Sequence, residues 1–260
     1  MKKIFFILAS VILLLSSCGT EIDPSDRLIY EKPELTGKNM LIEDFTGQNC
    51  INCPRAAGVI SDLMKTYGED KIIAVAIHSK PLGIAAPEGL MTDFTNAYAT
   101  HYGVEYQPVG MVNREYGLQT DDQWTGMVKY FMQDTAKINI TVEPTYDDAT
   151  RQSTANVQVV SLEGTATGKL QVWLVEDSII AKQMMPDGML NKSYVHNHVL
   201  RASYNGQWGE DITAAEGQTV TKSYSLTIDK DYDAKQCAIV AFIYNDSGVL
   251  QAVRSKKLKK

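Results

Sequence analysis

The segment that decides the fold is MLIEDFTGQNCINCPRAAGVISDLM, residues 40–64. Residues 40–45 form a short, mostly apolar run, which is typical of a strand, and a turn follows. After Pro54, apolar residues recur at the spacing of one helix face: Ala56, Val59, Ile60, Leu63 and Met64. Pro54 suits the first turn of a helix, where its missing N–H costs nothing. The segment therefore predicts a strand, a turn with two cysteines, and a helix.

The alternation of strand and helix continues beyond this segment. Residues 71–78 (KIIAVAIH) are almost continuously apolar, as expected of a strand that is buried on both faces. We expect helices over residues 89–101 and 121–137, with a strand over 109–113 between them. This order predicts an α/β sheet in a first domain of residues 39–137.

The remainder of the chain has a different pattern. From residue 138 onward, short runs of alternating apolar and polar residues are separated by polar turns. The expected strands are residues 138–142, 155–162, 169–176, 195–203, 221–228, 236–244 and 249–256. Short strands at this spacing predict a second, all-β domain over residues 138–260, an immunoglobulin-like antiparallel sandwich.

The N-terminus has the pattern of an export signal. Lys2 and Lys3 precede an apolar run over residues 4–15. This run is shorter than the roughly 20 residues that a membrane-spanning helix needs, so it predicts a signal peptide over residues 1–17. Small residues followed by Cys18 resemble the bacterial lipoprotein box, in which the thiol receives a diacylglycerol and the chain carries acyl groups such as palmitate. Ordinary cleavage that leaves Cys18 a free thiol is the alternative.

The residues after Cys18 predict the location of the protein. Gly19 stands where an Asp would signal retention in the inner membrane. The lipoprotein resemblance therefore implies the outer membrane, on a face that the sequence leaves undetermined. Residues 18–38 are rich in acidic residues and proline and predict a lipidated tether.

Composition restricts the class of partner. The chain has 44% hydrophobic and 22% charged residues, which is ordinary for a globular protein. Its net charge is −6, and no basic face stands out. A negative protein repels phosphate backbones, so we expect no nucleic-acid partner.

Cys50 and Cys53 form a Cys-x-x-Cys pair between a strand and a helix. A free thiol has a pKa near 8.5, and the positive end of a helix lowers it towards the reactive thiolate. The charge of Arg55 would add to that effect. We therefore predict a redox dithiol that needs no cofactor, with Cys50 as nucleophile and Cys53 as the resolving thiol. A structural disulfide and a metal site are the alternatives, although a zinc site would need four ligands.

Two stretches resemble the active site of thioredoxins. Asp44 and Phe45 precede the cysteine pair by the thioredoxin spacing, and the stretch Tyr106–Gly110 is similar to the cis-proline loop. The resemblance implies that Asp44 accepts the proton of the resolving thiol and that Pro108 shapes the substrate groove. The chain departs from thioredoxins between the cysteines, where Ile51 and Asn52 replace Gly-Pro.

A wider resemblance covers roughly residues 38–258. The chain resembles the outer-membrane-protein-28-related lipoproteins of Bacteroidetes. The residues that carry the likeness are Ile42–Gly47, Cys50, Cys53, Pro54, Arg55, Pro108, Asn113, Arg114, Tyr194–Arg201, Gly206, Trp208 and Gly209. The family implies a thioredoxin-like domain followed by a β-sandwich. It does not define an activity, and an adhesin-like role has been suggested for it.

Two features of the second domain bear on chemistry. His196 and His198 would share one face of a strand, which allows a metal pair, but a polar strand face that packs on the other domain is the simpler interpretation. We therefore assign no metal site. Cys237 stands alone in an apolar run and is expected to be a buried structural cysteine.

Two functions follow from these patterns. The first is a membrane-tethered oxidoreductase that exchanges thiols and disulfides with proteins of the cell envelope, with an exposed Cys50 of lowered pKa. The second is a surface binding or adhesion lipoprotein, in which the Cys50–Cys53 pair is only a structural disulfide. In either case the β-sandwich offers a surface for an unknown protein or glycan ligand.

Overall fold

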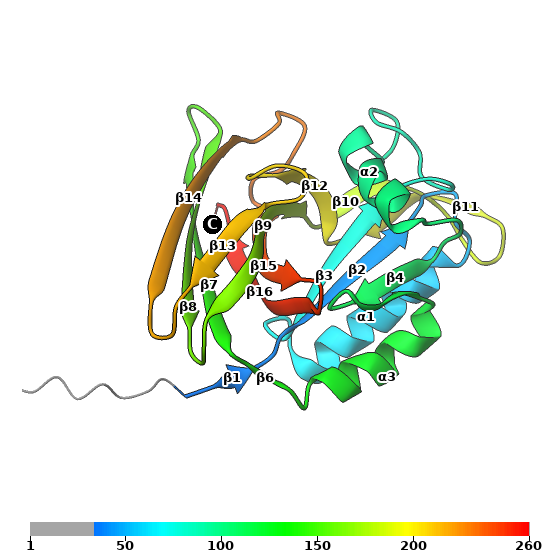
Figure 1. The fold of residues 1–260 in the computed structure, drawn as a ribbon. Helices are drawn as coiled ribbons and strands as arrows, with labels where there is room; N and C mark the ends of the chain where they lie inside the picture. The colour runs from blue at the N-terminus through cyan, green and yellow to red at the C-terminus, as the bar shows by residue number, and fades with distance from the viewer. Residues whose placement is uncertain (1–33, 260) are drawn as a thin grey trace, which may run out of the picture. The chain divides into compact units, whose positions relative to one another are not determined.

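The computed structural model describes residues 34–259 (Figure 1). Three helices lie in this part of the chain: α1 (Cys53–Tyr67), α2 (Asp93–Tyr102) and α3 (Asp121–Phe131). The predicted helix at 89–101 begins later than expected, because Thr92 caps α2 by accepting the backbone N–H of Thr95. The left-handed Gly103 ends the same helix.

The principal element is a nine-stranded mixed sheet. Its order is β16-β15-β9-β12-β3-β2-β4-β5, and β13 pairs with β9 beside this path. Its strands are β2 (Met40–Thr46), β3 (Ile72–His78), β4 (Val109–Val112), β5 (Glu115–Gln119), β9 (Ala166–Glu176), β12 (Val199–Ser203), β13 (Glu210–Ala214), β15 (Cys237–Asn245) and β16 (Gly248–Lys257). Strand β3 is parallel to both β2 and β12, and the other pairings are antiparallel.

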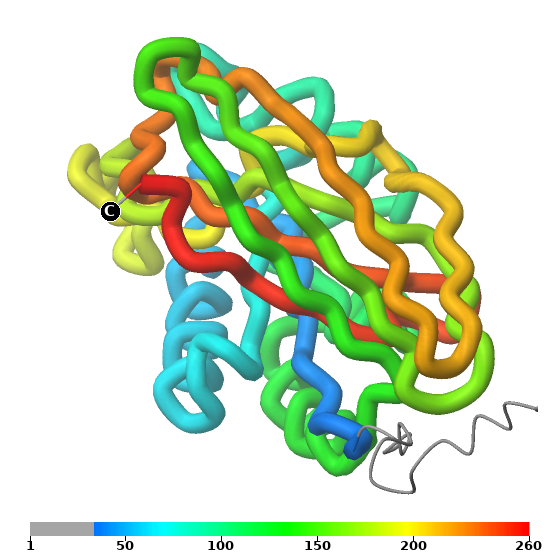
Figure 2. The backbone as a smooth tube through the Cα atoms, turned by 90° about the vertical axis from the view of Figure 1, so that its left-hand side faces the viewer, coloured from blue at the N-terminus to red at the C-terminus, as the bar shows by residue number. Residues whose placement is uncertain are grey.

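A smaller antiparallel sheet has the order β14-β8-β7. Its strands are β7 (Ile138–Asp147), β8 (Gln152–Ser161) and β14 (Thr219–Thr227). Figure 2 shows its three long strands lying side by side. Two further pairs are separate: β1 (Thr36–Gly37) with β6 (Thr135–Ala136), and the hairpin of β10 (Ile179–Met184) and β11 (Leu190–His196).

Three apolar clusters hold these layers together. One lies between the small sheet and the β9 and β15 end of the large sheet, with Val157 and Ile239 among its members. A second packs Ile42 and Ala74 against α1 and α3. The third covers the opposite face of the large sheet, where Phe45 and Trp173 belong to the same cluster. The large sheet is therefore buried on both faces over much of its width.

This architecture corrects the predicted fold class. A thioredoxin-like α/β domain followed by an immunoglobulin-like sandwich is wrong, because the described structure is predominantly β, with 50% strand and 16% helix. Strands expected in both parts instead share one sheet, while β7, β8 and β14 form the small sheet. Val199 of β12 pairs with Ala76 of β3, and the Ala76 N–H donates to the carbonyl of His198 at 2.8 Å. The apolar strand β3 thereby gains a hydrogen-bonding neighbour on each edge.

Candidate functional site

The two predicted cysteines form a disulfide at the junction of β2 and α1. Cys50 lies in the turn, where its N–H donates to the carbonyl of Gly47, and Cys53 is the first residue of the helix. The S–S distance is 2.13 Å. Cys50 is only 1% exposed and Cys53 3%. Cys50 is therefore buried in the oxidised protein, whereas the sequence led us to expect an exposed thiol.

Asp44 lies on β2, between Ala76 of β3 and Gly110 of β4. The side chain is buried, and its Oδ1 has no hydrogen-bond partner among the described residues. Burial, followed by the nearby charge of Asp121, raises the pKa of Asp44 to about 8. A β-carbon at Gly110 would lie 2.4 Å from the Glu43 carbonyl oxygen and 2.7 Å from Trp124, so this position beside Asp44 requires glycine.

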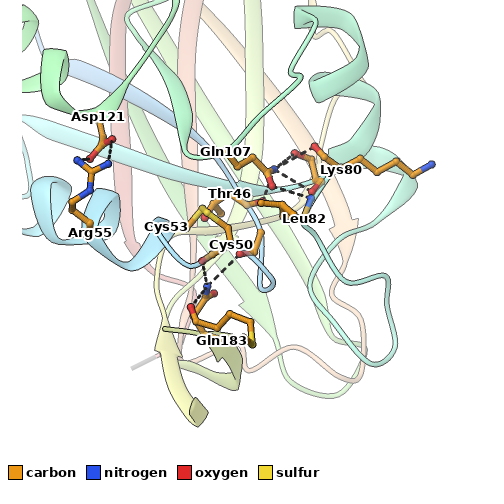
Figure 3. The surroundings of a disulfide bond; sticks show 12 residues. Thr46, Cys50, Cys53, Arg55, Lys80, Leu82, Gln107, Asp121 and Gln183 are labelled. Carbon is orange, nitrogen blue, oxygen red and sulfur yellow. Dashed lines mark hydrogen bonds and ion pairs between the residues drawn. A yellow bond between two sulfur atoms is a disulfide. The ribbon is translucent and has the colours of Figure 1, made fainter. Parts of the chain in front are cut away.

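Arg55 is placed differently from the sequence-based expectation. Its guanidinium pairs with the carboxylate of Asp121 at 3.0 Å, at the beginning of α3 (Figure 3). The Arg55 side chain is more than half exposed, whereas that of Asp121 is buried. The pair ties α1 to α3.

The loop that carries Pro108 packs beside the disulfide turn. The Gln107–Pro108 peptide bond is cis, and the Gln107 side chain is buried. Gln107 Nε2 donates to the carbonyl oxygens of Thr46 and Ser79, and its Oε1 accepts the N–H of Leu82 (Figure 3). One amide side chain therefore connects the end of β2 with the two loops beside it.

The hairpin of β10 and β11 covers the disulfide turn on the side away from the Pro108 loop. The sequence analysis did not predict this contact. Gln183 Nε2 donates to the Cys50 carbonyl at 2.8 Å and to the Gly47 carbonyl at 3.3 Å (Figure 3). The N–H of Met184 donates to the carbonyl of Gln48, whose side chain in turn donates to the carbonyl of Lys182. These bonds join the hairpin to the segment before the helix and contribute to the burial of Cys50.

A cleft of about 950 Å³ lies on the Cys53 side of the disulfide. Asp44, Cys53, His78 and His196 are among the residues that line it. The rings of His78 and His196 meet edge to face, with centroids 5.1 Å apart. Burial lowers the pKa of His78 well below its usual range and that of His196 to about 4, so both imidazoles are neutral near pH 7.

His196 and His198 do not form the metal pair that a single strand over 195–203 would allow. Strand β11 ends at His196 and β12 begins at Val199, and between them His198 adopts a left-handed backbone conformation with φ of 58°. The His198 ring faces Asp177 and Arg254 instead of the His196 ring. Within residues 34–259, no three His, Cys, Asp or Glu side chains are grouped as a metal site.

The remaining predicted residues are placed as follows. Cys237 is a buried free cysteine on β15. Cys18, the signal peptide and most of the tether lie outside the described residues. No helix in the described part of the chain is long and apolar enough to cross a membrane.

The fold and site together define a predominantly β protein with a buried Cys-x-x-Cys disulfide at the start of a helix. The family model for "Outer membrane protein Omp28" matches residues 95–260, more than half of the chain. The chain belongs to the Omp28 family of outer membrane proteins, which confirms the family resemblance. The match begins within α2, so the disulfide and Asp44 lie outside it.

Two solved structures are among those that match this chain. HBP35 of Porphyromonas gingivalis superposes with a TM-score of 0.67 at 18% sequence identity, covering 85% of this chain and 76% of that one, which shows a shared fold. A domain of the outer membrane lipoprotein Omp28 from the same organism is 28% identical, with a TM-score of 0.36, over 48% of this chain and 91% of that domain. A comparison with curated proteins finds no match.

Proposed function

We propose that this protein is a lipid-anchored outer-membrane protein whose Cys50–Cys53 pair exchanges disulfides with thiols of extracytoplasmic proteins. The family supports the location, and the short apolar run before Cys18 supports the anchor. Acylation of Cys18 would contribute about 0.8 kcal/mol for each buried CH₂ group, so two or three chains would hold the protein at the membrane.

The observation that carries the redox proposal is the neighbourhood of the disulfide. The helix N-terminus stabilises a thiolate, and the cleft beside Cys53 contains a buried carboxyl group, Asp44. A carboxyl group with a pKa of about 8 is ready to give or take a proton near neutral pH.

In the proposed reaction, a thiolate of the substrate protein attacks Cys50 Sγ. The S–S bond of the pair breaks, a mixed disulfide forms at Cys50, and Cys53 leaves as a thiolate that Asp44 protonates. A second substrate thiolate then displaces Cys50 from the mixed disulfide. The substrate leaves oxidised by two electrons, and the protein retains two thiols.

A binding lipoprotein with a structural disulfide is the second candidate, and the burial of both sulfurs favours it. The test is single-turnover oxidation of reduced, unfolded ribonuclease A by the purified protein. We expect exchange with the wild-type protein and none with Cys50→Ser, while Cys237→Ser serves as the control because Cys237 is buried on β15. If the wild-type protein does not oxidise the substrate, the binding role replaces the redox role.

A further inference from the structure

The cleft gives the disulfide an approach at Cys53, and the hairpin that contacts Cys50 also lines it through Gln183 and His196. Its lining includes Cys53 but not Cys50. Two alanines of β3, Ala74 and Ala76, and a glycine of α1, Gly58, also line it. These small side chains leave space beside Cys53. A volume of about 950 Å³ is in the range of sites that bind small molecules.

Three buried polar atoms among the cleft-lining residues have no partner in the described structure. They are Asp44 Oδ1, His78 Nδ1 and His196 Nε2, and each of these residues is at most 5% exposed. A buried polar atom without a partner costs about 1–3 kcal/mol. The cost is recovered when a ligand supplies the missing hydrogen bonds.

The protonation of His196 shows which kind of ligand these atoms would accept. Backbone hydrogen bonds with Ala181 and Lys182 favour a proton on the other ring nitrogen, so Nε2 keeps its lone pair. The buried part of the cleft therefore offers at least one acceptor, His196 Nε2, to a ligand that carries a hydrogen-bond donor.

We propose that the cleft admits a small aminothiol, whose thiol reaches Cys53 while its ammonium group donates to the unpartnered Nε2 of His196. The proposal rests on the exchange function above and assigns a second substrate class to the same disulfide. Protein thiols would react at Cys50 and small thiols at Cys53. One disulfide would then connect a macromolecular and a low-molecular-weight thiol pool.

The chemistry balances with two molecules of the aminothiol. The first attacks Cys53 Sγ as its thiolate, which breaks the Cys50–Cys53 bond and releases Cys50 as a thiolate that takes up a proton. The thiolate of the second attacks the aminothiol sulfur of the mixed disulfide, which forms the oxidised aminothiol dimer and releases Cys53 as a thiolate that Asp44 protonates. The protein gains two electrons and two protons, and the aminothiol pair loses them.

A matched pair of glycine variants tests the proposal. Gly58 of α1 lines the cleft, and Gly126 of α3 does not. Both are exposed helical positions where an added Cβ meets nothing within 4 Å, so leucine is accommodated at each. Leucine also favours a helix more than glycine does, so neither change should impair folding. Gly58→Leu would narrow the cleft, and Gly126→Leu is its control.

The probe is cysteamine, and the readout is the rate at which it reduces the oxidised protein. Acid quenching and peptide mass spectrometry locate the mixed disulfide. We expect Gly58→Leu to slow this reaction by at least roughly tenfold, Gly126→Leu to leave it unchanged, and the adduct to lie on Cys53. Oxidation of unfolded ribonuclease A should proceed at the wild-type rate in both variants.

The results separate the two proposals. Equal cysteamine rates in the two variants, or an adduct on Cys50, would overturn the cleft proposal while leaving protein exchange intact. Failure of the wild-type protein to oxidise ribonuclease A would overturn the exchange function itself. A further variant, His196→Phe, keeps an aromatic ring but removes the acceptor. It should reduce the preference for cysteamine over 3-mercaptopropionate at equal thiolate concentration, and an unchanged preference would exclude recognition of the ammonium group.

Discussion

Replacing Asp44 with asparagine should stabilise the oxidised protein at neutral pH. Burial raises the pKa of this carboxyl group from 3.8 to about 8. In the unfolded chain the group ionises near pH 4, whereas in the folded protein it stays protonated until about pH 8. The folded state therefore loses stability as the pH rises through this range, because the unfolded state releases the proton first.

The magnitude follows from the same shift. One pKa unit corresponds to 1.36 kcal/mol, so the carboxyl group destabilises the folded state by on the order of 4 kcal/mol at pH 7 and by little at pH 4. The asparagine side chain of the variant cannot ionise and has no such dependence. Its buried amide would lack some partners at a cost of about 1–3 kcal/mol, which is the same at every pH.

The assay is urea denaturation of oxidised wild-type protein and Asp44→Asn at pH 4, 5.5 and 7. We expect the stability of the variant relative to wild type to rise by on the order of 4 kcal/mol between pH 4 and pH 7. Asp62→Asn is the control, since that side chain is 79% exposed. A difference that stays constant with pH would refute the argument that Asp44 is a buried, protonated carboxyl group.

Three further predictions concern the surroundings of the site. Gln183→Ala removes the donor that holds the hairpin to Cys50, and we expect dithiothreitol to reduce the disulfide about 5–30 times faster; an unchanged rate would show that the hairpin does not limit access. Arg114→Met leaves the buried Glu43 carboxylate without its partner and should lower the free energy of unfolding by about 3–5 kcal/mol in urea denaturation, whereas a loss below about 1 kcal/mol would contradict this account of the pair. Burial raises the pKa of Cys237 to about 12, so iodoacetamide at pH 8 should label this thiol only after denaturation, and labelling of the native protein would be inconsistent with that burial.

Local sequence predicted the elements around the disulfide well. The spacing of apolar residues indicated β2, α1 and β3, because each of these elements buries a face with its own periodicity. The Cys-x-x-Cys spacing led to a prediction that Cys50 and Cys53 act together, and the two residues form a disulfide. These features depend on neighbours in the chain, which a single sequence displays directly.

The arrangement of distant segments was not accessible in the same way. Periodicity shows which side chains of β3 and β12 are buried, but not that the two strands pair. We also expected a single strand over 195–203. In the structure β11 ends at His196 and β12 begins at Val199, and the irregular residues between them turn His198 away from His196. The prediction of two separate fold types was wrong because periodicity does not show which strands pair, and here β3 and β12 pair within one sheet.

The hairpin over the disulfide was missed for a related reason. Residues 179–184 have little regular alternation of apolar and polar residues. Their position over the disulfide turn depends on a contact between residues distant in sequence, Gln183 and Cys50. The meeting of His78 with His196 likewise joins β3 to β11. Neither pair has a local sequence signal, so only the three-dimensional structure shows that they frame the disulfide.

The most direct test of the proposed function is the reduction potential of the Cys50–Cys53 disulfide, measured by equilibration with glutathione buffers. A working exchange site predicts a potential between about −270 and −120 mV, as in thiol–disulfide oxidoreductases. A potential below about −300 mV would identify a structural disulfide and contradict the exchange function.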